Sequence, residues 1–370
     1  MKTTTLMNKG MSEMNNHGEL SFEQIVSHLK ATGQEENELF QRAAAIKQTH
    51  VGNIVYLRGL IELSNICEKD CYYCGIRCSN REVHRYTLTH EEAINCIRFA
   101  HEKGVGSVAI QSGEIASATF TKKIDRIVRE AQKVTDGEIG ITLSCGEQTE
   151  ETYRRWFESG AERYLLRIET SNEKLYRQLH PEDGKHSYTR RIQALEALKK
   201  TGYQTGTGVM IGLPFQTVED LADDLLFMKQ MEIDMCGMGP YIEHAATPLW
   251  KEHYRLLPLG ERLRLALRMI ALLRILMPDI NIAATTALQA IDKGGREEAI
   301  LVGANVLMPN ITPSRYRDDY FLYENKPLSA RNDEEELDYL DERLQAIGHR
   351  IGYNLKGNSL RYGKRTSSLP

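Results

Sequence analysis

Residues 55–74 read Val-Tyr-Leu-Arg-Gly-Leu-Ile-Glu-Leu-Ser-Asn-Ile-Cys67-Glu-Lys-Asp-Cys71-Tyr-Tyr-Cys74, and this stretch decides how the rest of the chain is interpreted. Its first ten residues are rich in Val, Leu and Ile and predict a strand. Three cysteines follow directly, so three thiolates can converge at one strand end. Iron–sulfur clusters are normally held by four thiolates, and a cluster with only three leaves one iron open to an exogenous ligand.

Zinc is the alternative that the spacing leaves open. Cys78 follows Cys74 after three residues and could supply the fourth thiolate of a closed tetrahedral site. We favour the cluster because of the residues that follow in the chain. Seven cysteines in 370 residues do not form the dense framework of a secreted disulfide scaffold, so we expect a reducing, cytoplasmic compartment.

Strand-like runs alternate with helical patterns along the chain. The first strand is predicted at 55–64, and seven more at 107–112, 140–144, 163–168, 205–211, 235–241, 281–286 and 305–308. Helical patterns lie between them at 89–103, 120–133, 150–159, 189–200, 218–231 and 261–276. Alternation of this kind predicts a parallel sheet, and eight units predict a (β/α)8 TIM barrel with its site at the carboxyl ends of the strands.

Four regions are predicted. Residues 1–19 are expected to be disordered, and residues 20–50 to form a helical cover in which Ser21 and Gln24 make a capping box. Residues 51–325 are the predicted barrel. Residues 326–370 are predicted to hold an amphipathic helix at 333–347 and a weakly ordered tail from residue 352 onward.

Charge and hydropathy exclude several partners. Lys plus Arg number 47 against 51 Asp plus Glu, so the net charge of −4 provides no field that attracts nucleic acid or an anionic membrane. Residues 1–19 lack the apolar core of a signal peptide, and arginines interrupt the most apolar run, 263–277. We expect small-molecule ligands or a protein partner.

Motifs at the later strand ends extend the pattern of the cysteine loop. They are Arg58-Gly-Leu-Ile-Glu-Leu-Ser-Asn65, Arg85-Tyr86, Gln111-Ser-Gly-Glu114, Arg163-Tyr-Leu-Leu-Arg167-Ile-Glu169-Thr170, Met210-Ile-Gly-Leu-Pro214, Ala284-Thr-Thr-Ala287 and Gly303-Ala-Asn-Val-Leu-Met-Pro-Asn310. With them, the chain resembles the HydE family, the radical S-adenosylmethionine (SAM) maturases of [FeFe]-hydrogenase, from about residue 22 to residue 323. Biotin synthase and 3-methylornithine synthase share that architecture.

The resemblance implies a [4Fe–4S] cluster on Cys67, Cys71 and Cys74 that cleaves SAM to a 5'-deoxyadenosyl radical. It implies that the cofactor is held by Tyr73, Ser112, Gly113, Glu114, Ser144, Glu169, Arg191, Met210 and Ile211. It implies that the substrate is surrounded by Arg58, Gln111, Thr142, Arg163, Thr285 and Thr286. Because the last cysteine is Cys236, without the additional C-terminal cysteines of some family members, we predict a single cluster.

In the family that the chain resembles, the substrate is a cysteine-bound iron carrying two carbonyls and a cyanide, used in assembly of the hydrogenase H-cluster. The implied partners are an electron donor such as ferredoxin or flavodoxin and the companion maturases. One alternative is a radical mutase or sulfur-insertion enzyme with the same cofactor and another substrate. A second is a non-catalytic protein that holds a cluster or zinc for delivery.

Overall fold

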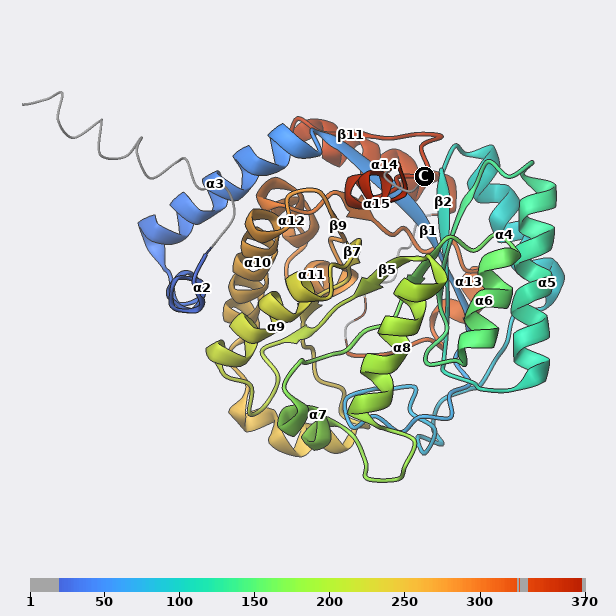
Figure 1. Cartoon of the computed structure of the whole chain (residues 1–370), viewed down its shortest axis with the longest axis horizontal. Helices are drawn as coiled ribbons and strands as arrows, with labels where there is room; N and C mark the ends of the chain where they lie inside the picture. Colours follow the sequence, from blue (N-terminus) through green and yellow to red (C-terminus); the bar gives the residue numbers. More distant parts are fainter. Residues whose placement is uncertain (1–19, 325, 327–331, 368–370) are drawn as a thin grey trace, which may run out of the picture.

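Eight parallel strands form a barrel at the centre of the computed structural model, which describes residues 20–324, 326 and 332–367 (Figure 1). In spatial order they are β10 (Val306–Leu307), β1 (Ile54–Ser64), β2 (Ser107–Ser112), β3 (Gly140–Ser144), β4 (Arg163–Leu165), β5 (Gln204–Thr207), β7 (Met235–Cys236) and β9 (Asn281–Ile282). A parallel bridge between Ala283 and Val306 joins β9 to β10. The predicted (β/α)8 barrel is confirmed.

Helices surround the barrel, and side-chain caps begin many of them. The helices are α2 (Phe22–Leu29), α3 (Gly33–His50), α4 (His90–Glu102), α5 (Ala118–Val134), α6 (Glu150–Glu158), α7 (Glu173–Leu179), α8 (Tyr188–Thr201), α9 (Val218–Gln230), α10 (Leu259–Leu276), α11 (Thr286–Ile291), α12 (Gly295–Val302), α13 (Ser314–Arg317), α14 (Asp333–Ala346) and α15 (Leu360–Ser367), with a 3-10 helix, η1, at Pro248–Arg255. The predicted capping box of Ser21 and Gln24 is present at α2. Thr89 and Glu92 make a second one at α4, so sequence-local hydrogen bonds set where both helices start.

Two predicted strands are interrupted. Residues 205–211 divide into β5 and β6 (Met210–Ile211), and residues 235–241 into β7 and β8 (Gly239–Pro240). β6 and β8 pair with each other in a separate two-stranded sheet. Gly208 lies against Gly237 so closely that a Cβ on Gly208 would stand 2.1 Å from the Gly237 carbonyl oxygen. The prediction of two continuous strands was wrong because this backbone contact is not visible in the local sequence.

Helices α2 and α3 pack against α9, α10 and α12. The contact with α10 includes the buried carboxylate of Glu36, which receives Arg268 Nη1 at 2.9 Å. Figure 1 shows α2 and α3 running along the outside of the barrel beside α10. The predicted disorder of residues 1–19 lies outside the described residues. Within the described part of the chain, no helix combines the length and apolar character needed to cross a bilayer.

The C-terminal region packs on the barrel at the end opposite the cysteine loop (Figure 1). The predicted helix at 333–347 is confirmed as α14, and β11 (Arg350–Ile351) pairs with β1. The predicted weak order from residue 352 was wrong for residues 352–367, while residues 368–370 lie outside the described part. Ser359 is 1% exposed, and Asn358 accepts hydrogen bonds from Arg163 and Gln204. Polar side chains at the strand starts therefore order this segment.

Candidate functional site

The loop after β1 brings three thiols together. Cys67, Cys71 and Cys74 are half-buried, and Cys67 Sγ accepts backbone N–H groups from Lys69 and Glu114, each at 3.4 Å. Burial and then the charges of the other two thiolates raise the pKa of Cys71 well above its usual range, and burial raises that of Cys74 to about 12. The three thiols therefore lie in one half-buried loop, and each would have to lose its proton to bind a metal.

Cys78, the fourth thiol of the zinc interpretation, is exposed. Its backbone N–H donates to Lys69 O at 2.8 Å. Across the described ranges, no three Cys, His, Asp or Glu side chains stand close enough to ligate a single metal ion. Tetrahedral zinc needs such an arrangement, whereas a cluster takes its thiolates on separate irons. Because Cys78 is exposed, it lies in a different environment from the three half-buried cysteines.

Four charged side chains form a closed ring beside this loop. Lys69 Nζ lies 2.9 Å from Glu114 Oε1 and 3.1 Å from Glu147 Oε2. Arg191 lies 3.5 Å from Glu114 through Nη2 and 2.7 Å from Glu147 through Nε. We call these four residues the ion ring. Their side chains are only 10–14% exposed, so the pairs are weakly screened by solvent.

The ion ring includes two predicted cofactor residues, Glu114 and Arg191, and two residues for which no role was predicted, Lys69 and Glu147. Lys69 lies inside the cysteine motif, and Glu147 ends the polar run after β3. Their positions beside the cysteines and at a strand end could have indicated a place near the site. Charged loop residues usually face solvent, however, so position alone does not predict an ion pair. Only the fold reveals that the two side chains meet.

A second group of predicted cofactor residues gathers at the ends of β4 and β6. Glu169 has a left-handed backbone with φ of 67°, a conformation that costs energy for a residue with a side chain. Its carboxylate receives Arg167 Nε, 3.0 Å from both oxygens, and its carbonyl accepts the N–H of Met210 at 3.1 Å. Met210 belongs to an apolar cluster against which Tyr73 packs. Glu169, Met210 and Tyr73 are thus brought to one side of the site.

Other predicted cofactor residues lie at the ends of the neighbouring strands. Ser112 ends β2 and has a buried hydroxyl without a hydrogen-bond partner among the described residues. Gly113 follows, and a Cβ there would stand 2.2 Å from Ile66 O. Ser144 ends β3 and pairs in register with Gln111, while Ile211 is fully buried in β6. The strand ends therefore present small or polar groups beside the cysteine loop.

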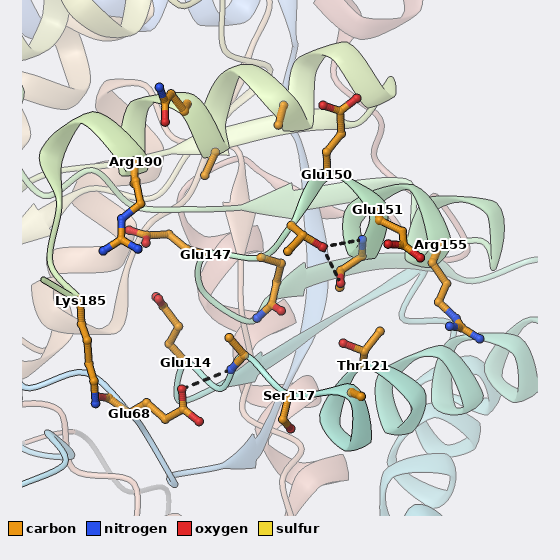
Figure 2. Close-up of a pocket in the computed structure, with 18 of the residues that line it drawn as sticks. Glu68, Glu114, Ser117, Thr121, Glu147, Glu150, Glu151, Arg155, Lys185 and Arg190 are labelled. Carbon is orange, nitrogen blue, oxygen red and sulfur yellow. Dashed lines mark hydrogen bonds between the residues drawn. The ribbon is translucent and has the colours of Figure 1, made fainter.

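An open cavity of about 800 Å³ lies on the outer side of the ion ring. Its walls come from the cysteine loop and helices α5, α6 and α8. In Figure 2, Glu114 and Glu147 lie on the same side of the view as Lys185 and Arg190, while Glu150, Glu151 and Arg155 lie on the opposite side. Glu114 is the one predicted site residue that lines it, so this cavity is distinct from the predicted barrel interior.

The predicted substrate residues divide into two sets. Gln111 lies beside the buried Tyr320, and Thr286 Oγ1 lies 2.9 Å from Tyr323 OH. Thr285 Oγ1 lies 3.5 Å from Met238 O. These three predicted residues lie on the carboxyl side of their strands, toward the cysteine loop.

Arg58, Thr142 and Arg163 lie farther toward the barrel base. Arg58 pairs in register with the first residue of β2, and Arg163 is the first residue of β4. Burial and then the positive charge of Arg163 lower the pKa of Arg58 to about 9. Within the described residues, Arg58 Nε, Thr142 Oγ1 and two nitrogens of Arg163 are buried without a hydrogen-bond partner. The base therefore holds two close arginines with unused donors.

The segment between α7 and α8 buttresses the cysteine loop, a contact that the sequence did not indicate. Asp70 N–H donates to His186 Nε2 at 3.0 Å, and His186 Nδ1 lies 2.8 Å from Asp183 Oδ1. Tyr72 N–H donates to Leu179 O at 2.9 Å. The His186 side chain is completely buried, and this bonding fixes its proton on Nδ1.

Comparison with known proteins agrees with this geometry. The family model of the radical SAM superfamily matches residues 61–228. The [FeFe] hydrogenase maturase subunit HydE of Thermotoga maritima is 43% identical over 86% of this chain and 88% of that protein. A 3-methylornithine synthase of Methanosarcina acetivorans is 27% identical over 89% of this chain and 90% of that protein.

Solved structures agree in fold. Methylornithine synthase (PylB) superposes with a TM-score of 0.77 over 95% of this chain and 97% of that one, at 22% identity. The FeFe-hydrogenase maturase HydG of Carboxydothermus hydrogenoformans gives a TM-score of 0.78 over 97% and 81%, at 20% identity. At these identities, the likeness concerns the arrangement of the barrel alone.

Proposed function

The chain belongs to the HydE family of the radical SAM superfamily, and from this premise we propose that it is a radical SAM enzyme acting in assembly of the [FeFe]-hydrogenase H-cluster. The observation that carries the proposal is the set of three half-buried thiols in the loop that follows the carboxyl end of β1. The family implies a [4Fe–4S] cluster and SAM, and the residues present fit both groups.

The fit to the cluster rests on two features of the cysteine loop. Cys67 Sγ receives two backbone N–H groups, which stabilise negative charge on sulfur. Gly113 leaves no room for a side chain against Ile66 and Cys67, so β2 and the loop can approach closely. Cys67, Cys71 and Cys74 would hold the cluster. When bound, the reduced cluster supplies the electron that cleaves SAM into methionine and a 5'-deoxyadenosyl radical.

For SAM, we propose the residues expected from the sequence. The carboxylate of Glu169 and the guanidinium of Arg191 supply charged hydrogen bonds that orient the polar parts of the cofactor. Both already have opposite charges beside them, Arg167 for Glu169 and the ion ring for Arg191, which fix their side chains in advance. The remaining contacts are proposed for Tyr73, Ser112, Gly113, Glu114, Ser144, Met210 and Ile211.

The substrate proposed for the barrel interior is a cysteine-bound iron with two carbonyls and a cyanide. Polar atoms of Arg58, Thr142 and Arg163 that are buried without a hydrogen-bond partner among the described residues support a ligand with hydrogen-bonding groups, since such atoms are costly to bury unpaired. Glu162 Oε1 lies 3.0 Å from Arg163 Nη2 and compensates part of the positive charge. Gln111, Thr285 and Thr286 are proposed to contact the same ligand nearer the cysteine loop. Enclosure by the barrel excludes water from the radical reaction.

The second candidate is a radical mutase or sulfur-insertion enzyme. The similarity to 3-methylornithine synthase along nearly the whole chain favours it over other classes. The cofactor residues would be the same, so only the substrate separates the two candidates. We further propose a cytoplasmic protein that receives electrons from a ferredoxin or flavodoxin and works with the companion maturases.

Anaerobic assays test the proposal. The reconstituted protein is incubated with dithionite and SAM, with or without the iron–cysteine precursor, and 5'-deoxyadenosine is quantified. We expect SAM cleavage that depends on Cys71, so Cys71→Ala abolishes it. We expect the iron–cysteine precursor to stimulate the cleavage, and an amino acid of the kind that a 3-methylornithine synthase converts not to stimulate it. Unchanged cleavage by Cys71→Ala would reject the radical SAM assignment. Stimulation by an amino acid alone would favour the second candidate.

A further inference from the structure

Two residues from different segments donate to the same sulfur. Lys69 lies in the cysteine loop and Glu114 follows β2, yet the backbone N–H groups of both point to Cys67 Sγ at 3.4 Å. A third contact holds these segments together, since Glu68 N–H donates to Glu114 O at 2.8 Å. The geometry at the sulfur therefore depends on how the loop and the end of β2 are held relative to each other.

The side chains of the same two residues are joined to each other. Lys69 Nζ lies 2.9 Å from Glu114 Oε1, and the two side chains are 10% and 12% exposed. The ammonium group also reaches Glu147 Oε2 at 3.1 Å and the backbone oxygen of Lys185. Lys69 thus has three partners on three segments, which fixes its position more firmly than a solvated ion pair could.

We propose that the Lys69–Glu114 ion pair is a positioning pair that keeps both N–H donors on Cys67 Sγ and thereby sets the reduction potential of the cluster. The inference rests on the proposed function, because it assumes that Cys67 is a cluster ligand. Hydrogen bonds to cluster sulfurs are one of the factors that set the potential. They stabilise the more negative, reduced state, so losing them lowers the potential.

A direct effect of charge predicts a different pattern. If the two side chains acted only through their own charges, removal of the Lys69 cation would lower the potential and removal of the Glu114 anion would raise it. If the pair acts by holding the N–H donors, breaking it from either side releases them. Both replacements then lower the potential.

The experiment compares Lys69→Met and Glu114→Met with Lys69→Arg, which keeps a cation able to pair with Glu114. Lys185→Met is the matched control, because Lys185 Nζ reaches the same loop at Glu68 O, 3.5 Å away, but Lys185 gives no N–H to a cysteine sulfur. Iron and sulfide content is measured first. The midpoint potential of the reconstituted cluster is then determined by anaerobic redox titration followed by electron paramagnetic resonance.

We expect both methionine variants to shift the reduction equilibrium at least tenfold toward the oxidised cluster. For a one-electron couple, this shift corresponds to a midpoint potential that is about 59 mV lower. Lys69→Arg and Lys185→Met should stay near the wild-type potential. Opposite shifts in the two methionine variants, or no shift in either, would overturn the proposal. If neither methionine variant holds a cluster, the midpoint potential of Lys69→Arg becomes the test. A lowered potential in Lys69→Arg, which keeps the ion pair, would also contradict the proposal. Absence of a cluster from the wild-type protein would instead refute the proposed function.

Discussion

Gly113 offers a direct test of how closely β2 must approach the cysteine loop. In Gly113→Ala, the new Cβ would stand 2.2 Å from Ile66 O, 2.7 Å from Ile66 C and 2.9 Å from Cys67 Cβ. Ordinary contact begins at 3.4 Å, so the two backbones must separate by about 1.2 Å. These neighbours are backbone atoms and the Cβ of a proposed ligand, which cannot rotate away.

A displacement of about 1 Å at a reacting centre can cost on the order of 100-fold in rate. We therefore expect Gly113→Ala to lower 5'-deoxyadenosine formation per bound cluster by about that factor, measured anaerobically with dithionite and SAM after iron determination. Gly260→Ala is the matched control, because a Cβ there meets nothing within 4 Å. If Gly113→Ala has wild-type iron content and forms 5'-deoxyadenosine within about threefold of the wild-type rate, the close approach of β2 to the cysteine loop is not required, and the reasoning is refuted.

Three further predictions concern the supporting structure. His186→Ala should lower the free energy of unfolding by about 1–3 kcal/mol, because it leaves the Asp70 N–H without its acceptor. His186→Gln keeps an acceptor oxygen and should cost less. Equal losses of unfolding free energy for the two variants in urea titrations would contradict the role of this hydrogen bond. Burial lowers the pKa of Lys47 to about 7 from 10.5, so between pH 7 and pH 9 Lys47 is deprotonated in the folded state but still protonated in the unfolded state. The free energy of unfolding should therefore rise by about 2 kcal/mol over this pH range. The rise should vanish in Lys47→Met, and its persistence there would exclude Lys47 as the cause. Asn358→Leu should cost about 1–3 kcal/mol because Arg163 loses a buried acceptor, and an unchanged thermal midpoint would show that the base is held by other contacts.

Features set by neighbouring residues could be predicted from the sequence. β2 and β3 have the predicted bounds because each is a short apolar run ending in serine, and the first cap follows from Ser21 and Gln24. The position of the cysteine loop after β1 could be predicted for the same reason, since Cys67, Cys71 and Cys74 lie within eight residues. Local pattern and local structure agree at these places.

Features that depend on distant partners could not be predicted. The segment that contains Asn358 is polar and has no apolar period, and it is ordered by Arg163, 195 positions earlier. No role follows from the sequence for Lys69 or Glu147, because only the closed barrel brings Lys69 to Glu147 and Glu147 to Arg191. The breaks after β5 and β7 coincide with the approach of Gly208 to Gly237, a backbone contact between two segments far apart in the sequence.

The packing of the C-terminal segment on the strand starts covers the end of the barrel away from the cysteine loop, so the two ends rest on different contacts. One opening is governed by the cysteine loop and its buttress at His186, and the other by residues 352–367, which bond to Arg163, Gln204 and Asp234. A fragment that ends at residue 325 would lack the contacts of residues 352–367 with Arg163, Gln204 and Asp234, so we expect water to reach the buried Arg163 in such a fragment.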